Sequence, residues 1–214
     1  MKMFNKKFLI IFLIIILSIS YFIFGNSQNG TISTSHNNST WNTYTNKYFD
    51  FQIDFPSNWR VYEDFQSDLP VINIYKSTFD KNPPFDYFSN ADVIVIFPLG
   101  FNSEVLVGQI IDSQIELNSE LEIDKKIEYV LDNNEPFASA ITFSKVPKNW
   151  KKWGSVWSVS EVKNIDYFCR RDNVRISLEN CNPFDEDVFA RMGEIDQDTK
   201  KIQQEIIKSF SFIK

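Results

Sequence analysis

Cys169 and Cys181 are the only cysteines of this chain and its first candidates for chemistry. An even number of cysteines in an exported chain predicts a disulfide, and closing a loop of this size would contribute about 3 kcal/mol to stability. The alternative is a pair of reduced thiols, which we would expect only in a reducing compartment. Because the single His of the chain is His36, far from both cysteines, neither a zinc site nor an activated thiol nucleophile is expected.

Three arginines lie between the two cysteines, in a domain that is otherwise acidic. They are Arg170, Arg171 and Arg175. Since guanidinium groups bind carboxylates in a two-pronged geometry, a disulfide-closed loop carrying them predicts a basic surface for an acidic protein partner. The alternative is that these arginines neutralise acids of the same chain, at Asp172, Glu179 and 185–187.

A second candidate surface is a group of tryptophans, Trp150, Trp153 and Trp157, with lysines among them. Exposed indole rings stack on sugar rings or on peptides, so this region predicts a site for a glycan or another small ligand. The alternative is core packing, because the period of a strand places Trp153 and Trp157 on one face.

The sequence holds none of the common catalytic motifs. No Walker loop, GxSxG, HExxH or GxGxxG pattern occurs, and the consecutive acids 185–187 lack the spacing of a calcium loop. A carboxylate pair for glycoside hydrolysis cannot be singled out among 28 acidic residues, so a hydrolase stays a third alternative. The net charge of −6 argues against nucleic-acid binding. We therefore expect no catalytic residue, no metal and no cofactor, and classify the chain as a non-enzyme.

The first 25 residues have the composition of a targeting segment. Lys2, Lys6 and Lys7 precede an apolar run over 8–24, which as a helix would extend roughly 25 Å, the short end of a membrane span. Basic residues on its N-terminal side predict a single-pass anchor in the cell membrane, with a cytoplasmic N-terminus and an extracytoplasmic remainder. The alternative is a signal peptide cleaved near 18–20 to give a secreted protein, but the apolar run continues past that point.

Two further segments follow the anchor. Residues 26–43 are rich in Asn, Ser and Thr and predict a flexible linker, which contains His36. Residues 44–214 have the composition of one globular domain. Without the three N-terminal lysines, 19 basic residues remain against 28 acidic ones, a charge of −9. Because anionic lipid head groups repel such a charge, we expect the domain to stand off the membrane surface.

The apolar pattern of the domain indicates its secondary structure. Alternation predicts strands at 49–55, 59–61, 71–75, 92–97, 138–143 and 156–165. The strands at 49–55 and 59–61 are expected to form a hairpin-like pair, and a turn at 132–134 leads into the strand at 138–143. Apolar residues at a four-residue spacing predict a helix over 103–117. Residues 119–131 fit either a helix or a hairpin, and we favour the hairpin. Asp196 suits the start of a helix, which a closing strand at 210–212 follows.

Both ends of the domain carry a recognisable pattern. The segment 44–59, YTNKYFDFQIDFPSNW, ends in a hydrophobic-Pro-x-x-Trp motif, and 206–212, IIKSFSF, has the form of a helix end followed by a Ser-Phe-x-Phe strand. These segments resemble the opening and the ending of PsbP-like domains. The resemblance implies a membrane-anchored bacterial type of the photosystem accessory-subunit fold, an α/β/α sandwich around a mainly antiparallel sheet. Asp50 stands where that family usually has Gly, and no ion-binding residue can be matched.

The sequence thus predicts an α+β domain behind one N-terminal transmembrane helix. The expected function is that of a membrane-anchored extracytoplasmic accessory or protein-interaction domain without catalytic activity. The alternative is a glycan- or small-ligand-binding module that uses the region Trp150–Trp157.

Overall fold

The computed structural model describes residues 30–34, 40–65, 69–76, 91–100, 109–182 and 187–213. The expected transmembrane helix over 8–24, its alternative cleavage near 18–20, and His36 lie outside these ranges. Within them, no helix combines the length and the apolar character that a bilayer crossing requires.

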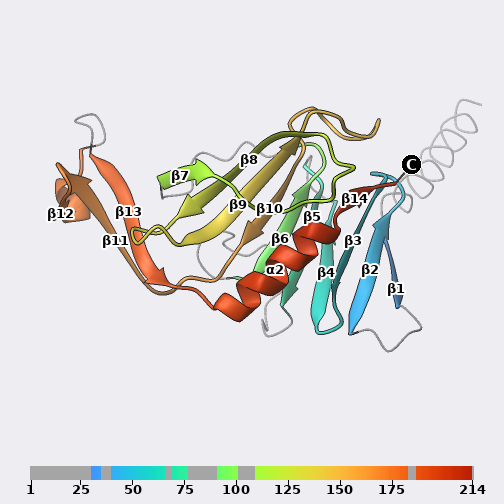
Figure 1. Ribbon diagram of the computed structural model, residues 1–214, viewed down its shortest axis with the longest axis horizontal. Coiled ribbons are helices and arrows are strands. Elements are labelled where there is room, and N and C mark those ends of the chain that lie inside the picture. The colour runs from blue at the N-terminus through green and yellow to red at the C-terminus, as the bar shows by residue number, and fades with distance from the viewer. Residues whose placement is uncertain are drawn as a thin grey trace, which may run out of the picture.

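A four-stranded antiparallel sheet stands at the N-terminal side of the molecule (Figure 1). Its order is β1-β2-β3-β14, with bounds Thr31–Thr34, Trp41–Asn46, Phe51–Pro56 and Ser211–Phe212. The expected linker 26–43 therefore includes β1 and the start of β2. β1 pairs with β2, which places residues outside the predicted globular range into the sheet.

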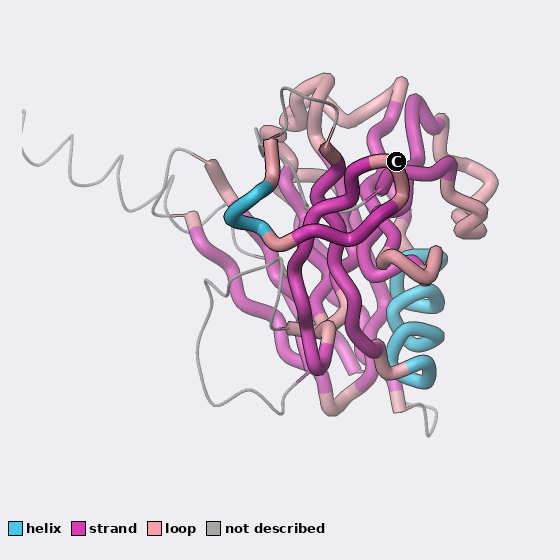
Figure 2. The backbone as a smooth tube through the Cα atoms, turned by 90° about the vertical axis from the view of Figure 1, so that its left-hand side faces the viewer, coloured by secondary structure: helices cyan, strands magenta, loops and turns pink. Residues whose placement is uncertain are grey.

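A seven-stranded antiparallel sheet forms the centre. Its order is β4-β5-β6-β10-β9-β8-β7, with bounds Trp59–Asp64, Val71–Lys76, Val93–Phe97, Ser155–Val159, Pro136–Phe143, Ile123–Val130 and Gln109–Asp112. Every residue of β6 is buried, as its continuous apolar sequence predicts for a central strand. The helix α2, Gln197–Ser209, packs on one side of the strands (Figures 1 and 2).

The main core lies between the two sheets and α2. It contains alternate residues of β3 and β6 together with Ile206 and Ile207 of the helix. An aromatic group fills its centre, where Phe210 stacks on Phe51 and on Phe143 with ring centroids 5.6 Å apart in each pair. A second apolar cluster covers the opposite face of the seven-stranded sheet, with Val93, Val95 and Phe97 among its members.

The helix α2 begins where the sequence predicts it. The carboxylate of Asp196 accepts hydrogen bonds from the backbone amides of Asp198 and Thr199, each 3.0 Å long, which satisfies two of the free N–H groups of the first turn. The closing strand β14 follows directly and pairs with β3. The expected helix start and closing strand are confirmed.

The third sheet projects from the rest of the molecule (Figure 1). Its order is β12-β11-β13, with bounds Val174–Ile176, Lys163–Arg171 and Val188–Glu194, and the short 3-10 helix η1, Leu178–Asn180, follows β12. We call these four elements the arm. The other two sheets together with α2 are called the body.

The predicted α/β/α sandwich is wrong. The described residues hold fourteen strands and one α-helix, so the fold is β-rich and has no second helical layer. The expected helix over 103–117 accounts for part of the error. Its residues 101–108 lie outside the described ranges, and Gln109–Asp112 form strand β7, which pairs with β8. Three apolar residues at a four-residue spacing are too short a pattern to outweigh strand pairing.

Other local expectations have mixed outcomes. The hairpin reading of 119–131 is confirmed, because β8 pairs with β9. The hairpin-like pair of 49–55 and 59–61 is wrong: β3 pairs with β2 and β14, whereas β4 pairs with β5 in the other sheet. The single strand expected over 156–165 is split into β10 and β11, which belong to different sheets.

Candidate functional site

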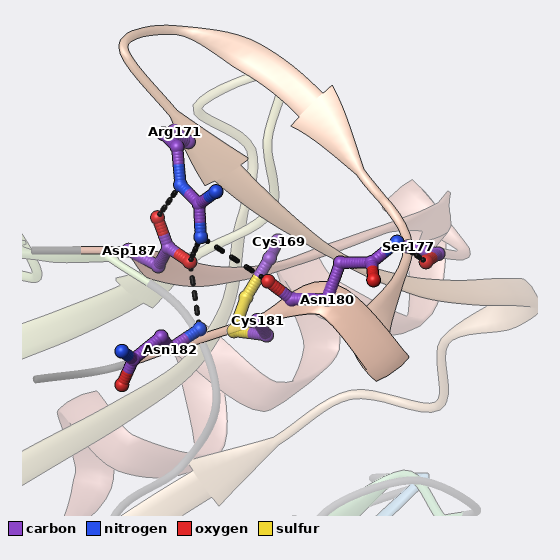
Figure 3. The surroundings of a disulfide bond; sticks show 7 residues. All are labelled: Cys169, Arg171, Ser177, Asn180, Cys181, Asn182 and Asp187. Atoms are coloured by element: carbon purple, nitrogen blue, oxygen red, sulfur yellow. Dashed lines mark hydrogen bonds and ion pairs between the residues drawn. A yellow bond between two sulfur atoms is a disulfide. The ribbon is translucent and has the colours of Figure 1, made fainter. Parts of the chain in front are cut away.

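The predicted disulfide is confirmed. Cys169 lies on β11 and Cys181 directly follows η1, with their Cα atoms 5.7 Å apart (Figure 3). The Cys169 side chain is fully buried. The bond therefore fixes η1 and the end of the β12 segment to the central strand of the arm.

Arg171 lies beside this disulfide and binds Asp187. Its Nε and one terminal nitrogen each donate to a carboxylate oxygen of Asp187 at 2.8 Å, and the terminal nitrogen also donates to the carbonyl of Asn180 (Figure 3). The backbone amide of Asn182 donates to the same carboxylate at 2.7 Å. The hydrogen bonds from Arg171 hold the pKa of the Asp187 carboxyl below its usual range. This pair connects β11 to β13 and to the segment after η1.

Arg170 joins the arm to the body. It donates two hydrogen bonds, of 2.6 and 2.5 Å, to the carboxylate of Asp132, in the turn between β8 and β9. These bonds lower the pKa of the Asp132 carboxyl. The backbone amide of Asp132 in turn donates to the carbonyl of Arg191 on β13 at 2.9 Å. Two strands of the arm are therefore held at the tip of one hairpin of the body.

Arg175 covers an aromatic ring of the arm. Its guanidinium carbon lies 4.3 Å from the ring centroid of Phe168, and that of Arg170 lies 5.8 Å from the same ring. Arg175 also forms an ion pair with Asp166 on β11. These contacts leave Phe168 only 2% exposed although the arm is thin.

The structure thus brings the three predicted arginines together on two neighbouring strands of the arm, β11 and β12, and gives each a carboxylate partner within the chain. One of these acids, Asp187, belongs to the run that the sequence analysis named as the alternative to an acidic partner. The other two acids do not belong to that run. Asp132, which binds Arg170, is distant in sequence, and Asp166, which binds Arg175, lies on the neighbouring strand β11.

Large apolar side chains are exposed on the arm. Val174 is 62% exposed and Phe189 40% exposed, on opposite sides of β11 in the sheet order. Four more exposed residues share the arm: Tyr167, Leu178, Val188 and Met192. A groove of about 560 Å³ is lined by residues of β11, β12 and η1, among them Tyr167, Ile176 and Leu178.

These apolar residues were not predicted from the sequence to form a binding surface. A signal was present, since Val188 to Met192 reads as four apolar residues and one Arg after an acidic run. Nothing in that pattern distinguishes an exposed strand from a buried one, because exposure depends on which elements cover the strand.

The three predicted tryptophans lie in different environments. Trp150 is buried in the main core and donates to the carbonyl of Phe49 at 2.6 Å. Trp157 is half-buried on the opposite sheet face and stacks on Tyr129, with centroids 5.9 Å apart. Trp153 alone is exposed, at 65%, and its indole N–H donates to the carbonyl of Leu99 at 2.7 Å. The structure therefore does not bring these rings together on one surface.

Comparison with known proteins identifies no relative. Neither a protein family, nor a curated protein, nor a solved structure matches this chain. The resemblance to PsbP-like domains therefore stays a prediction. Within the described ranges, no group of three or more His, Cys, Asp or Glu side chains is placed to hold a metal ion.

Proposed function

We propose that this chain is a membrane-anchored extracytoplasmic accessory domain that binds another protein through the exposed apolar side chains of its arm. One observation carries the proposal. In the described part of the chain, six of the eleven exposed large apolar residues lie on the arm; the others are Ile32, Leu69, Ile110, Ile111 and Trp153. Apolar residues gathered on a projecting element are typical of a protein-binding surface.

The arm is held in one shape before it meets a partner. The disulfide fixes η1 to β11, and the Arg171–Asp187 pair fixes β13. A preformed surface loses less conformational entropy on binding, so these bonds favour affinity. The disulfide also supports the extracytoplasmic location, because such bonds persist in oxidising compartments.

The chemistry of the arm favours a partner with an apolar, weakly charged surface. Arg170, Arg171 and Arg175 already bind carboxylates of this chain, so an acidic partner would have to displace those pairs. The net charge of −6 disfavours both an anionic membrane and a second copy of the chain as the occupant.

Site-specific crosslinking tests the proposal in intact cells. A photoreactive residue at position 174 or 189 of the full chain, which share one face of the arm, is expected to crosslink to one protein, whereas the same residue at position 201, on the exposed side of α2, is not. Binding of that purified partner should then weaken about tenfold or more in Phe189→Asp, since truncation or charge at an interface anchor commonly has this effect.

The outcomes separate the alternatives. Crosslinks to lipid, to a second copy of this chain, or equally from position 201 would contradict the proposal, as would unchanged affinity of Phe189→Asp. Protease added to intact cells tests the location separately: an extracytoplasmic domain is cleaved, and a domain spared by the protease contradicts that part of the proposal.

A further inference from the structure

A cleft of about 370 Å³ lies between α2, strand β8 and the segment that joins β7 to β8. Its lining includes Glu128 from β8, and Lys200 and Gln204 from α2. A smaller hollow shares these three residues and extends the cleft inward to Ser139 and Ser158. Clefts of this size accommodate a small organic molecule.

The floor of the cleft is a polar row across three strands. Glu128 on β8 is directly opposite Ser139 on β9, which is directly opposite Ser158 on β10. Residues directly opposite one another in adjacent strands point to the same face of a sheet. The row therefore interrupts the apolar face on which α2 packs, and it does so beneath the cleft.

Ser139 has an unused hydrogen-bonding group at this floor. Its side chain is 3% exposed and its hydroxyl oxygen has no partner within the protein. The neighbouring polar groups differ, since Ser160 donates to Gln203 at 2.7 Å and Gln203 donates to the carbonyl of Val159 at 2.7 Å. Because a buried hydroxyl without a partner is costly, the orphan oxygen points to a ligand that would supply one.

Two opposite charges face the same cleft. Glu128 is only 8% exposed, and burial raises the pKa of its carboxyl. Lys200 is half-buried, and this burial lowers the pKa of its ammonium. Glu128 accepts a hydrogen bond from the backbone amide of Gln114, and the charges of Glu128 and Lys200 attract each other across the cleft. Among the described residues neither forms an ion pair within 4.0 Å, whereas Lys208 at the outer end of the cleft binds Glu116 at 2.6 Å.

We propose that this cleft binds a small zwitterion of the α-amino acid class, with the ligand ammonium at Glu128 and Ser139 and the ligand carboxylate at Lys200. Each charge then gains an opposite charge in direct contact, and the hydroxyl of Ser139 accepts a hydrogen bond from the ammonium. The inference is independent of the arm, because the cleft lies wholly within the body.

Calorimetric titration of the full-length protein with glycine, L-alanine and L-glutamine tests this inference. Saturable binding of at least one of them is expected. N-acetylglycine, which lacks the ammonium, and glycine methyl ester, which lacks the carboxylate, should bind about tenfold more weakly or not at all. Absence of binding by all three amino acids overturns the proposal.

Three variants and a matched control locate the site. Glu128→Gln and Lys200→Met should each weaken binding about tenfold, and Ser139→Ala about fivefold. Lys201→Met, one residue further along α2 with its side chain 74% exposed, should bind as the unchanged protein does. Glu128→Gln removes a buried carboxylate that has no ion-pair partner, so this variant should stay folded, as circular dichroism can verify. Binding that survives both charge-removing variants, or that Lys201→Met weakens equally, overturns the assignment.

Discussion

Large apolar side chains are mostly buried in the body and mostly exposed in the arm. Phe51, Phe143 and Phe210 of the body are at most 2% exposed, and Phe210 stacks on the other two rings, whereas Val174 and Phe189 of the arm are 62% and 40% exposed. The body is stabilised by burial of apolar surface between two sheets and a helix. The arm has too few layers for such a core and relies on a disulfide and on arginine–carboxylate pairs. The difference indicates that the body supplies stability and the arm supplies a surface.

The largest effect is expected from an aromatic residue of the body. Phe210→Ala should lower the free energy of unfolding by about 3 to 5 kcal/mol, because it leaves a cavity among Phe51, Phe143 and Trp150. The same change on the arm, Phe189→Ala, should cost no more than about 1.5 kcal/mol, since that side chain is largely exposed. Urea unfolding followed by tryptophan fluorescence measures both. Equal costs for the two variants would break the comparison.

The second effect concerns the disulfide. Cys169→Ser combined with Cys181→Ser should remove about 3 kcal/mol from the arm, because the closed loop no longer restricts the unfolded chain. We expect amide hydrogen exchange to accelerate in β11, β12 and β13 while the strands of the body keep their protection. If exchange accelerates equally in β6 and β9, the arm and the body unfold as one unit and the distinction between them fails.

Structural features of the body and the arm were predictable from the sequence where they depend on residues close together in the chain. Strand β6, the Asp196 helix cap and the disulfide were predictable, because a continuous apolar run, one capping carboxylate and an even cysteine count are local or simple signals. The assignment of β3 and β4 to different sheets was not, since alternation defines a strand but not its neighbour.

For the candidate sites too, local features were predictable from the sequence and pairings between distant residues were not. Arg170, Arg171 and Arg175 were singled out by their position between the cysteines, but their partner Asp132 lies 38 residues away from Arg170 in sequence. The cleft residue Glu128 was hidden in an ambiguous segment, and only the register of β8 against β9 places it beside Ser139. Pairings between distant segments are set by tertiary packing, which a single sequence does not reveal.

The pH dependence of stability is a third, smaller difference between the arm and the body. Arginine hydrogen bonds lower the pKa of Asp187 in the folded arm and of Asp132, the body residue that binds Arg170 of the arm. The stabilisation from these two carboxyls is therefore present at neutral pH and is lost as the pH falls through the lowered values, below about pH 4. In the body, burial raises the pKa of Asp92 and Glu128. The folded body then binds protons more tightly than the unfolded chain, so it gains stability as the pH falls from neutral toward about 4.

Unfolding at a series of pH values, with exchange resolved for arm and body peptides, checks this contrast. Asp92→Asn together with Glu128→Gln should abolish the gain of the body on mild acidification, while Asp187→Asn should abolish part of the loss of the arm at lower pH. A body that loses stability between about pH 7 and about pH 5 would contradict the assignment of the raised pKa values to buried carboxyls.

The smallest change in stability is expected where the arm is most apolar. Val174→Thr combined with Val188→Thr keeps the β-branched shape that strands favour and replaces an exposed methyl group by a hydroxyl that water can reach. The free energy of unfolding should therefore stay within about 0.5 kcal/mol of its original value, as for most surface substitutions. The same two changes at the buried positions Val93 and Val95 of β6 serve as the control and should be strongly destabilising, because each buries a hydroxyl in an apolar cluster.

If the arm variant loses more than about 1 kcal/mol, its valines are packed in the free protein and are not kept for a partner. If it is as stable as expected but binds the crosslinked partner more weakly, the two regions divide stability and recognition between them.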